Sequence, residues 1–157
     1  MIAAMLLQRI QQHFIDSADL KYQAAQVLSQ PIAAAVHAIL ASARQHNLNN
    51  GITGILCYGG GVFLQAIEGG RSAVNHLYNH IIEDPRHQNV ELLHYEEISE
   101  RRFGGWTMGQ VNLSKLNTSI VLKYSERPEL DPYAVSGEVS LALLEELMAT
   151  ASIIGRA

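Results

Sequence analysis

The chain of 157 residues has the length of one ordinary domain, since domains cluster near about 100–150 residues. Its composition, 48% hydrophobic and 17% charged, is that of a soluble globular protein, and the net charge of -4 gives no sign of nucleic-acid binding. No apolar run approaches the roughly 20 residues of a membrane span, and no signal peptide is recognised. The single cysteine, Cys57, excludes an intramolecular disulfide, and we expect a cytoplasmic protein.

The first part of the chain predicts a helix, a weak strand and a second helix. Ile2, Leu6, Ile10 and Phe14 recur every four residues, which favours a helix over residues 1–16. Residues 19–28 form a weak strand candidate. Pro31 is typical of a first helical position, and the apolar period that follows predicts a helix ending near residues 45–47.

The middle and end of the chain alternate strands with helices. Strands are predicted over 52–58, 62–68, 90–98 and 106–112, and helices over 71–83 and 136–151. The order β-α-β-β-α-β-β predicts an α+β fold, a ferredoxin-like mixed sheet with two helices on one face. We divide the chain into an N-terminal helical extension (1–18), a domain (19–112) and a C-terminal helical extension (113–157).

One polar residue interrupts the apolar strand 62–68. Gln65 shares a strand face with Phe63 and Ile67, because side chains alternate along a strand. A buried amide must find hydrogen-bond partners or cost about 1–3 kcal/mol. It can be a structural glutamine bonded to backbone or water. It also suits a ring edge with mixed donors and acceptors, such as that of flavin.

Other chemistry has little support in the sequence. His76 and His80 are four residues apart on one predicted helix, but no further Cys/His or Glu-rich cluster completes a metal site, so no metal is expected. The glycines at 59–61 and 69–70 lack the phosphate-loop patterns and are interpreted as turns. No Ser/His/Asp or Cys/His arrangement is recognisable.

Five separated motifs between residues 39 and 111 together resemble the BLUF family of blue-light receptors that use FAD. Beyond residue 111 there is a looser likeness to short single-domain members, in Val121-Leu-Lys-Tyr-Ser125. The motifs are His46-Asn47, Gly51-Ile-Thr-Gly54, Phe63-Leu-Gln65 with Glu68-Gly69, Asp84-Pro-Arg-His87 and Arg102-Phe-Gly-Gly-Trp106-Thr-Met108.

The resemblance implies a flavin between the two central helices and the sheet, and Gln65 as the switch residue. FAD is the implied cofactor, with FMN and riboflavin as alternatives. Trp106 and Met108, two apart on the predicted last strand and so on one face of it, would relay the rearrangement of Gln65 to the surface. The residues implied to contact the flavin are Ile39, His46, Asn47, Phe63, Gln65, His80, Arg86 and His87.

The family's photochemistry also needs a tyrosine on the first strand, bonded to the glutamine, which supplies an electron and a proton to the light-excited flavin. Tyr22 is the nearest candidate, one position further from Asn47 than the usual spacing, with Ala24 in the place of the usual serine. A competing alignment places Val27-Leu28-Ser29 on the family's Tyr-x-Ser and leaves valine at that position.

The favoured function is therefore a blue-light sensor that is not an enzyme and that acts on a downstream partner protein. The alternative is a flavin-binding or protein-interaction module of the same fold with a lost or degraded photocycle. A flavin-dependent redox enzyme has no sequence support. A homo-oligomer is expected, because the stripe at 1–16 and one face of the last helix are apolar; that face comprises Val139, Leu143, Leu144 and Leu147.

Overall fold

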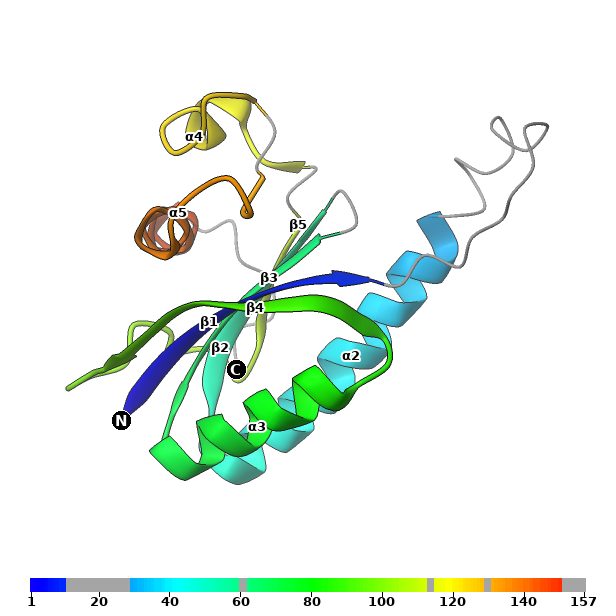
Figure 1. Cartoon of the computed structure of the whole chain (residues 1–157), viewed down its shortest axis with the longest axis vertical. Coiled ribbons are helices and arrows are strands. Elements are labelled where there is room, and N and C mark those ends of the chain that lie inside the picture. The colour runs from blue at the N-terminus through cyan, green and yellow to red at the C-terminus, as the bar shows by residue number, and fades with distance from the viewer. Residues whose placement is uncertain (11–28, 60–61, 113–114, 129–130, 151–157) are drawn as a thin grey trace.

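The computed structural model describes residues 1–10, 29–59, 62–112, 115–128 and 131–150, built around one five-stranded sheet (Figure 1). The strands are β1 (Ile2–Ile10), β2 (Thr53–Gly59), β3 (Val62–Gly69), β4 (His87–Glu97) and β5 (Gly109–Asn112). They are ordered β4-β1-β3-β2-β5, and all neighbours are antiparallel except β2 and β5. The predicted fold class, a ferredoxin-like mixed sheet, is confirmed.

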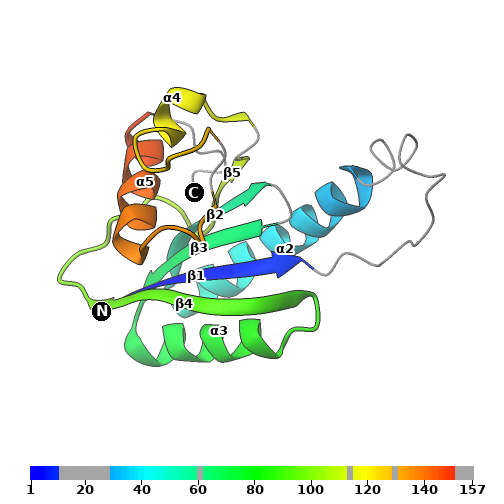
Figure 2. The ribbon, with the colours of Figure 1, turned by 45° about the horizontal axis from the view of Figure 1, so that its top comes forward.

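The predicted N-terminal helix is wrong over Ile2–Ile10, which form strand β1 inside the sheet between β3 and β4 (Figure 2). A four-residue spacing is also two periods of a strand, so the repeat could not separate the two structures. Pairing on both edges, together with burial of Ile2, Ala3, Ala4 and Leu6, favours the strand. Residues 1–10 are therefore no separate extension, and the predicted strand over 19–28 lies outside the described residues.

Two helices cover one face of the sheet, as predicted. Helix α2 (Ser29–Asn50) is longer than expected at both ends, and α3 (Arg71–Glu83) matches its predicted bounds. Their apolar stripes pack on the side chains of β1, β2 and β3 that point to this face. The cluster between them comprises Ile2, Ala4, Leu6, Val36, Leu40, Ile52, Leu56, Phe63, Ile67, Val74, Ile81 and Met108.

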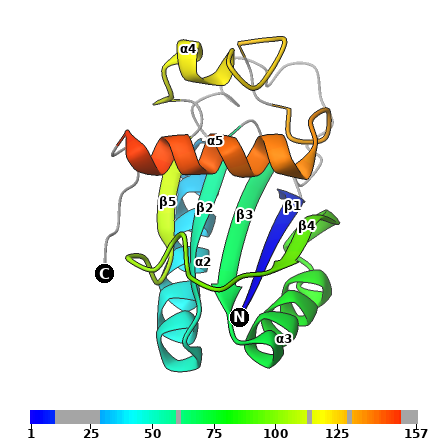
Figure 3. The ribbon, with the colours of Figure 1, turned by 90° about the vertical axis from the view of Figure 1, so that its left-hand side faces the viewer.

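The C-terminal part of the chain covers the opposite face (Figure 3). The short helix α4 (Thr118–Val121) precedes α5 (Gly137–Ala149), which lies across the strands. Leu143, Leu144 and Leu147 of α5 are fully buried against β2, β3 and β5. The proposal that this helix face mediates self-association is therefore wrong, because the chain's own sheet covers it. In the described part of the stripe at 1–16, the side chains of Ile2 and Leu6 are buried within the chain itself. A homo-oligomer therefore stays a prediction, but these two apolar faces no longer support it.

At two glycines the backbone lies so close to a neighbouring strand that a side chain would not fit. A Cβ atom added at Gly54 would lie 2.2 Å from the carbonyl oxygen of Ala66 on the neighbouring strand. A Cβ atom added at Gly137, at the start of α5, would likewise lie 2.2 Å from the carbonyl oxygen of Leu93 on β4. Glycine is required at both positions because a side chain would collide with backbone. Within the described residues, the helices are too short or too polar to span a membrane.

Candidate functional site

A cavity of about 270 Å³ opens between α2, α3 and the sheet. Its walls are apolar on the sheet side, where Leu56 and Phe63 point inward, and more polar toward the end of α3. A largely apolar cleft with a few convergent polar groups is the usual form of a small-molecule site. Residues predicted to contact the flavin contribute much of the lining, namely Ile39, His46, Phe63, Gln65, His80, Arg86 and His87.

Gln65 is the polar residue of the cavity's sheet wall. It is 6% exposed and lies in β3 between Phe63 and Ile67, which belong to the helix-covered cluster. Its Nε2 donates to the sulfur of Met108 at 4.0 Å, which is a weak hydrogen bond because thioether sulfur is a poor acceptor. The structure thus places an amide at the cavity wall, and its bond to the Met108 sulfur is weak enough to be exchanged for a better one.

Asn47 is a second buried amide beside the cavity. It lies in the last turn of α2, four residues after Ala43, which lines the cavity on the same side of the helix. Its Nδ2 donates to the carbonyl oxygen of Thr107 at 2.6 Å, and its fully buried Oδ1 has no hydrogen-bond partner. The bond to Thr107 fixes the orientation of the side-chain amide, with the Nδ2 directed at Thr107. The Oδ1 is left as an acceptor suited to a ligand N–H group.

The polar end of the cavity contains an ion pair that sequence reasoning missed. The Arg86 guanidinium donates to Asp84, with Nε 2.9 Å from Oδ1, and lowers the pKa of that carboxyl to about 2. Arg86 is therefore already neutralised. Burial lowers the pKa of His87, whose ring meets the ring of Phe63 edge-on with 6.1 Å between the centroids. Its Nδ1 is buried without a hydrogen-bond partner, a second polar atom available to a ligand.

The two unpartnered atoms, Asn47 Oδ1 and His87 Nδ1, bear on whether the residues fit a flavin. A flavin ring has an apolar body and one edge of mixed hydrogen-bond donors and acceptors. The cavity offers an apolar wall and polar groups at Gln65 and His87, and Asn47 lies next to the lining residue His46 with its Oδ1 unpartnered. The residues present fit such a ring. The spacing Asp84-x-Arg86 could have indicated the ion pair, whereas the cavity residues Ser42, Ala43, Leu77 and Ile81 carry no signal distinct from an ordinary helix face.

Trp106 and Met108 do not share one face, contrary to the sequence-based expectation. Strand β5 begins only at Gly109, so both residues lie in the irregular segment before it and the alternation of a strand does not apply. Met108 is buried in the cluster under α2 and α3. Trp106 packs against the opposite cluster under α5. The segment between them therefore crosses from one side of the sheet to the other.

The strand position beside Gln65 has no tyrosine. Leu6 of β1 is paired with Gln65 and belongs to the same buried cluster as Phe63 and Ile67. The strand Ile2–Ile10 contains no aromatic residue at all. Tyr22, the predicted photoactive tyrosine, lies outside the described residues. Its place relative to Gln65 therefore stays a prediction.

The sheet with two helices over one such cavity defines the class of protein as a ferredoxin-like α+β domain with a small-molecule cavity, and sequence comparison names the family. Residues 19–109 match the family described as "BLUF: Sensors of blue-light using FAD". This match covers more than half of the chain, so the chain belongs to that family. Because the family is one of sensors, the matched region is a sensor domain and not an enzyme.

Individual relatives agree with this assignment. The chain is 38% identical over 82 residues to photoactivated adenylate cyclase subunit beta of Euglena longa, which is 52% of this chain and 10% of that protein. It thus spans about a tenth of the length of this curated relative. The dark-state structure of BlrB, a BLUF protein, is similar with a TM-score of 0.69 and 31% identity, covering 96% of both chains.

A shorter likeness points to a different protein. A stretch of 36 residues is 75% identical to part of phosphoheptose isomerase from Methylibium petroleiphilum, which is 23% of this chain and 18% of that enzyme. Fewer than about 40 residues seldom form a domain with its own core. This stretch is therefore a shared segment rather than a second domain.

Proposed function

We propose that this chain senses blue light through a flavin held between α2, α3 and the sheet, and that a change in the hydrogen bonds of Gln65 is the switch. The observation that carries the proposal is the position of Gln65 in the cavity wall, almost fully buried and bonded weakly to Met108. A switch needs two states that differ in free energy of interaction. The bond from Gln65 to the Met108 thioether is weak, so exchanging that bond for one to a ligand atom costs little.

The flavin would be held by groups of two kinds. Ile39 and Phe63 would pack on the ring, and the Oδ1 of Asn47 and the Nδ1 of His87 would meet polar atoms at its edge. When bound, the flavin supplies the absorption of blue light and accepts an electron in its excited state. Arg86 is paired with Asp84, so it contributes less to binding phosphate than its charge suggests. FAD is the cofactor proposed, since the family is described by its use.

Tyr22 is the proposed electron donor. The family match begins at residue 19 and so includes Tyr22, which supports the assignment. The tyrosine would give an electron and a proton to the excited flavin and take both back as Gln65 changes its hydrogen bonds. The output would pass to a partner protein through the C-terminal part of the chain.

A second function is favoured by one observation, the pairing of Leu6 with Gln65. If β1 keeps this place in the working protein, no hydroxyl group lies beside the switch amide from that strand. The domain would then bind flavin without a normal photocycle and act as a binding or interaction module.

The absorption spectrum of the purified chain loaded with FAD, in darkness and just after blue light, tests the first function. A flavin band that shifts to the red and returns in darkness supports the light sensor. A bound flavin whose band does not move supports the module without a photocycle. A chain that binds no flavin contradicts both.

Two variants separate the two functions further. Tyr22→Phe abolishes the shift if Tyr22 is the donor, because phenylalanine has no hydroxyl group to give up a proton. Leu6→Tyr restores a shift if the wild-type chain has lost its donor, because it places a hydroxyl group on the residue paired with Gln65. Wild-type behaviour in Tyr22→Phe would contradict the assignment of Tyr22.

A further inference from the structure

Three exposed apolar residues lie along one edge of the molecule, where helix α3 runs beside the edge strand β4 (Figure 2). Ile82 of α3 is 45% exposed, and Leu92 and Tyr95 of β4 are 46% and 43% exposed. They are three of the six large apolar side chains that are exposed within the described residues. Scattered apolar residues are ordinary on a protein surface, whereas a group of them at one place usually marks a contact with another molecule.

Leu92 and Tyr95 both point to the side of the sheet on which α3 lies. They are paired with Leu6 and Ala4 of β1, which belong to the cluster under the helices, and directly paired residues share a face of the sheet. The hydroxyl of Tyr95 also reaches α3, where it donates to Asn75 Oδ1 at 3.4 Å. The exposed apolar residues of the strand and of the helix are therefore on the same side of the sheet.

Two contacts show that α3 and β4 run in opposite directions. Arg71 in the first turn of α3 forms an ion pair with Glu97, the last residue of β4. The bond between Asn75 and Tyr95 comes next, later on the helix and earlier on the strand. The level of any residue on one element can therefore be compared with the other.

The apolar residues beyond this bond form one continuous patch. Ile82 lies two helical turns past Asn75, about 10 Å along α3. Leu92 lies three residues before Tyr95, about 10 Å along β4. Ile82 and Leu92 are therefore level with each other, and the half-buried Tyr78 lies on the same side of α3, four residues before Ile82. We call Tyr78, Ile82, Leu92 and Tyr95 the edge patch.

The backbone of β4 is poorly suited to adding a further strand. Its pairing with β1 shifts register twice, between Met5 and Leu6 and between Leu7 and Arg9. Such irregularities bend an edge strand and hinder pairing with another strand. A partner is therefore expected to contact the side chains of α3 and β4 rather than the backbone.

The charges at the two ends of α3 favour a second copy of the chain as that partner. Arg71 is in the first turn and Glu83 is the last residue, so both charges oppose the helix dipole. The Arg71 side chain is 62% exposed and donates one bond, from Nη2 to Glu97, so other N–H groups remain for a second carboxylate. Glu83 is exposed, and no Lys or Arg of the described residues pairs with it.

An antiparallel pair of α3 helices satisfies the charges and the apolar residues in one register. It brings Arg71 of each copy to the end of the helix where the other copy has Glu83. In that register the level of Asn75, and so of Tyr95, falls between Tyr78 and Ile82 of the other copy. Apolar side chains then cover apolar side chains, and the two helix dipoles are opposed.

We propose that the edge patch is a contact between two copies of this chain, related by a two-fold axis, with their α3 helices antiparallel and Arg71 paired with Glu83 across the contact. The inference goes beyond the proposed function and requires no change at Gln65. Helix α3 has 13 residues and is about 20 Å long. The contact is therefore smaller than a standard interface of roughly 1,600 Å², and the dimer is a weak one.

The first test is the molar mass of the full chain, loaded with FAD and kept in darkness, by sedimentation from about 5 to about 300 μM, a range that resolves micromolar dissociation constants. The mass should rise from one chain to two. Ile82→Asp should weaken the dimer more than about tenfold, because it places a charge in the apolar contact. Leu122→Asp is the matched control, since Leu122 is 51% exposed and follows α4 on the other side of the sheet.

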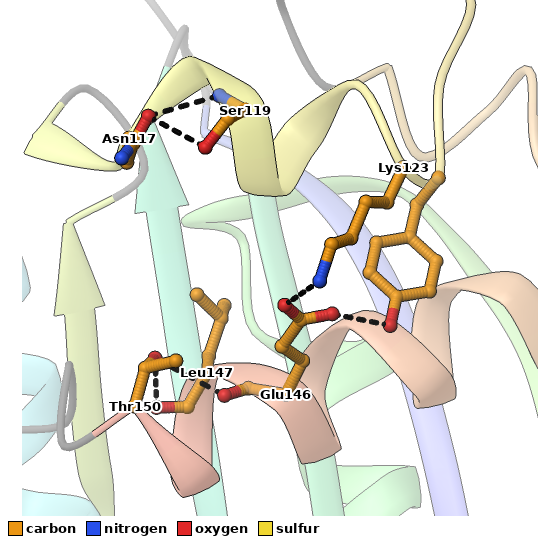
Figure 4. A network of polar contacts seen from close by, with 7 residues as sticks. Asn117, Ser119, Lys123, Glu146, Leu147 and Thr150 are labelled. Atoms are coloured by element: carbon orange, nitrogen blue, oxygen red, sulfur yellow. Dashed lines mark hydrogen bonds and ion pairs between the residues drawn. The ribbon is translucent and has the colours of Figure 1, made fainter.

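The second test reverses the charges. Arg71→Glu and Glu83→Arg should each weaken the dimer about tenfold, because each places like charges together across the contact. The two changes combined should restore the wild-type dissociation constant to within about threefold, because the pair is formed again with its signs exchanged. Lys123→Glu changes the net charge as Arg71→Glu does, at an ion pair with Glu146 on the other side of the sheet, and should leave the dimer unchanged (Figure 4).

A wild-type chain with the mass of one chain at every concentration overturns the proposal and leaves the edge patch to a different protein. A dimer that Ile82→Asp and both charge reversals leave unchanged overturns the edge patch as its contact. Restoration by the combined variant supports the proposal and shows that the single variants were folded. The mass does not depend on a photocycle, so the proposed light-sensing function can fail while this inference holds.

Discussion

The two faces of the sheet bury polar side chains in different ways, although one strand, β3, supplies Glu68 to one face and Gln65 to the other. On the α5 face, Glu68 has both oxygens bonded to backbone N–H groups. On the α2 and α3 face, Gln65 reaches a thioether and Asn47 keeps a buried acceptor without a partner. Folded proteins seldom leave such groups unpaired. The difference indicates that Glu68 serves the fold, while the Oδ1 of Asn47 awaits a ligand.

The largest expected effect comes from Gly54→Ala, which disturbs the strands shared by both faces. The added Cβ would lie 2.2 Å from the carbonyl oxygen of Ala66, which cannot move without shifting the strand. We expect a loss of about 3 kcal/mol in the free energy of unfolding, measured in urea. Gly70→Ala is the control, because nothing lies within 4 Å of its added Cβ. Equal stability of the two variants would contradict the strand register.

Glu68→Gln tests the face where the polar group serves the fold. The amide can accept only one of the two N–H groups and turns a donor toward the other, so we expect a loss of about 2 kcal/mol. Glu96→Gln, which alters a partly exposed carboxylate, should cost less than about 1 kcal/mol. Flavin binding should change little in either variant. A Glu68→Gln protein as stable as wild type would show that the carboxylate is not held as described.

Asn47→Ala tests the face that awaits a ligand. It removes the amide whose Oδ1 is unpartnered, and with it the bond to Thr107. We expect flavin affinity to fall about fivefold, the equivalent of one hydrogen bond of about 1 kcal/mol, in a fluorescence titration. Ser42→Ala, at another cavity position, is the control. An unchanged affinity in Asn47→Ala would separate Asn47 from the ligand.

The smallest effect concerns acid stability at the polar end of the cavity. Arg86 lowers the pKa of Asp84 from 3.8 to about 2 in the folded chain. Stabilisation from this pair is therefore present above pH 4 and lost as the pH falls toward 2. Asp84→Asn should remove about 0.5 kcal/mol at neutral pH and flatten that part of the stability profile. Glu83→Gln, the exposed neighbour, should keep the wild-type profile.

Much of the helix-covered face could be predicted from the sequence because its pattern is local. The apolar period of α3 and the alternation around Gln65 each fix which side chains point inward. The N-terminal strand could not be predicted, because a repeat of four fits a helix and a strand equally and only pairing with β3 and β4 decides. Sequence spacing also could not place Trp106 and Met108, since their faces depend on where β5 begins.

The α5 helix teaches a related limit. Its apolar face was predicted, but a pattern cannot say what covers that face, and the sheet of the same chain does. The partners of Arg102 were equally hidden, because Glu96 and Glu145 come from separate elements that only the fold brings together.

The most direct test of the account is the light-minus-dark absorption spectrum of the wild-type chain beside Gln65→Leu, both loaded with FAD. The account predicts that both bind the flavin and that only the wild-type band shifts to the red and recovers in darkness. A Gln65→Leu protein that shifts as the wild type does would contradict the role of Gln65 as the switch.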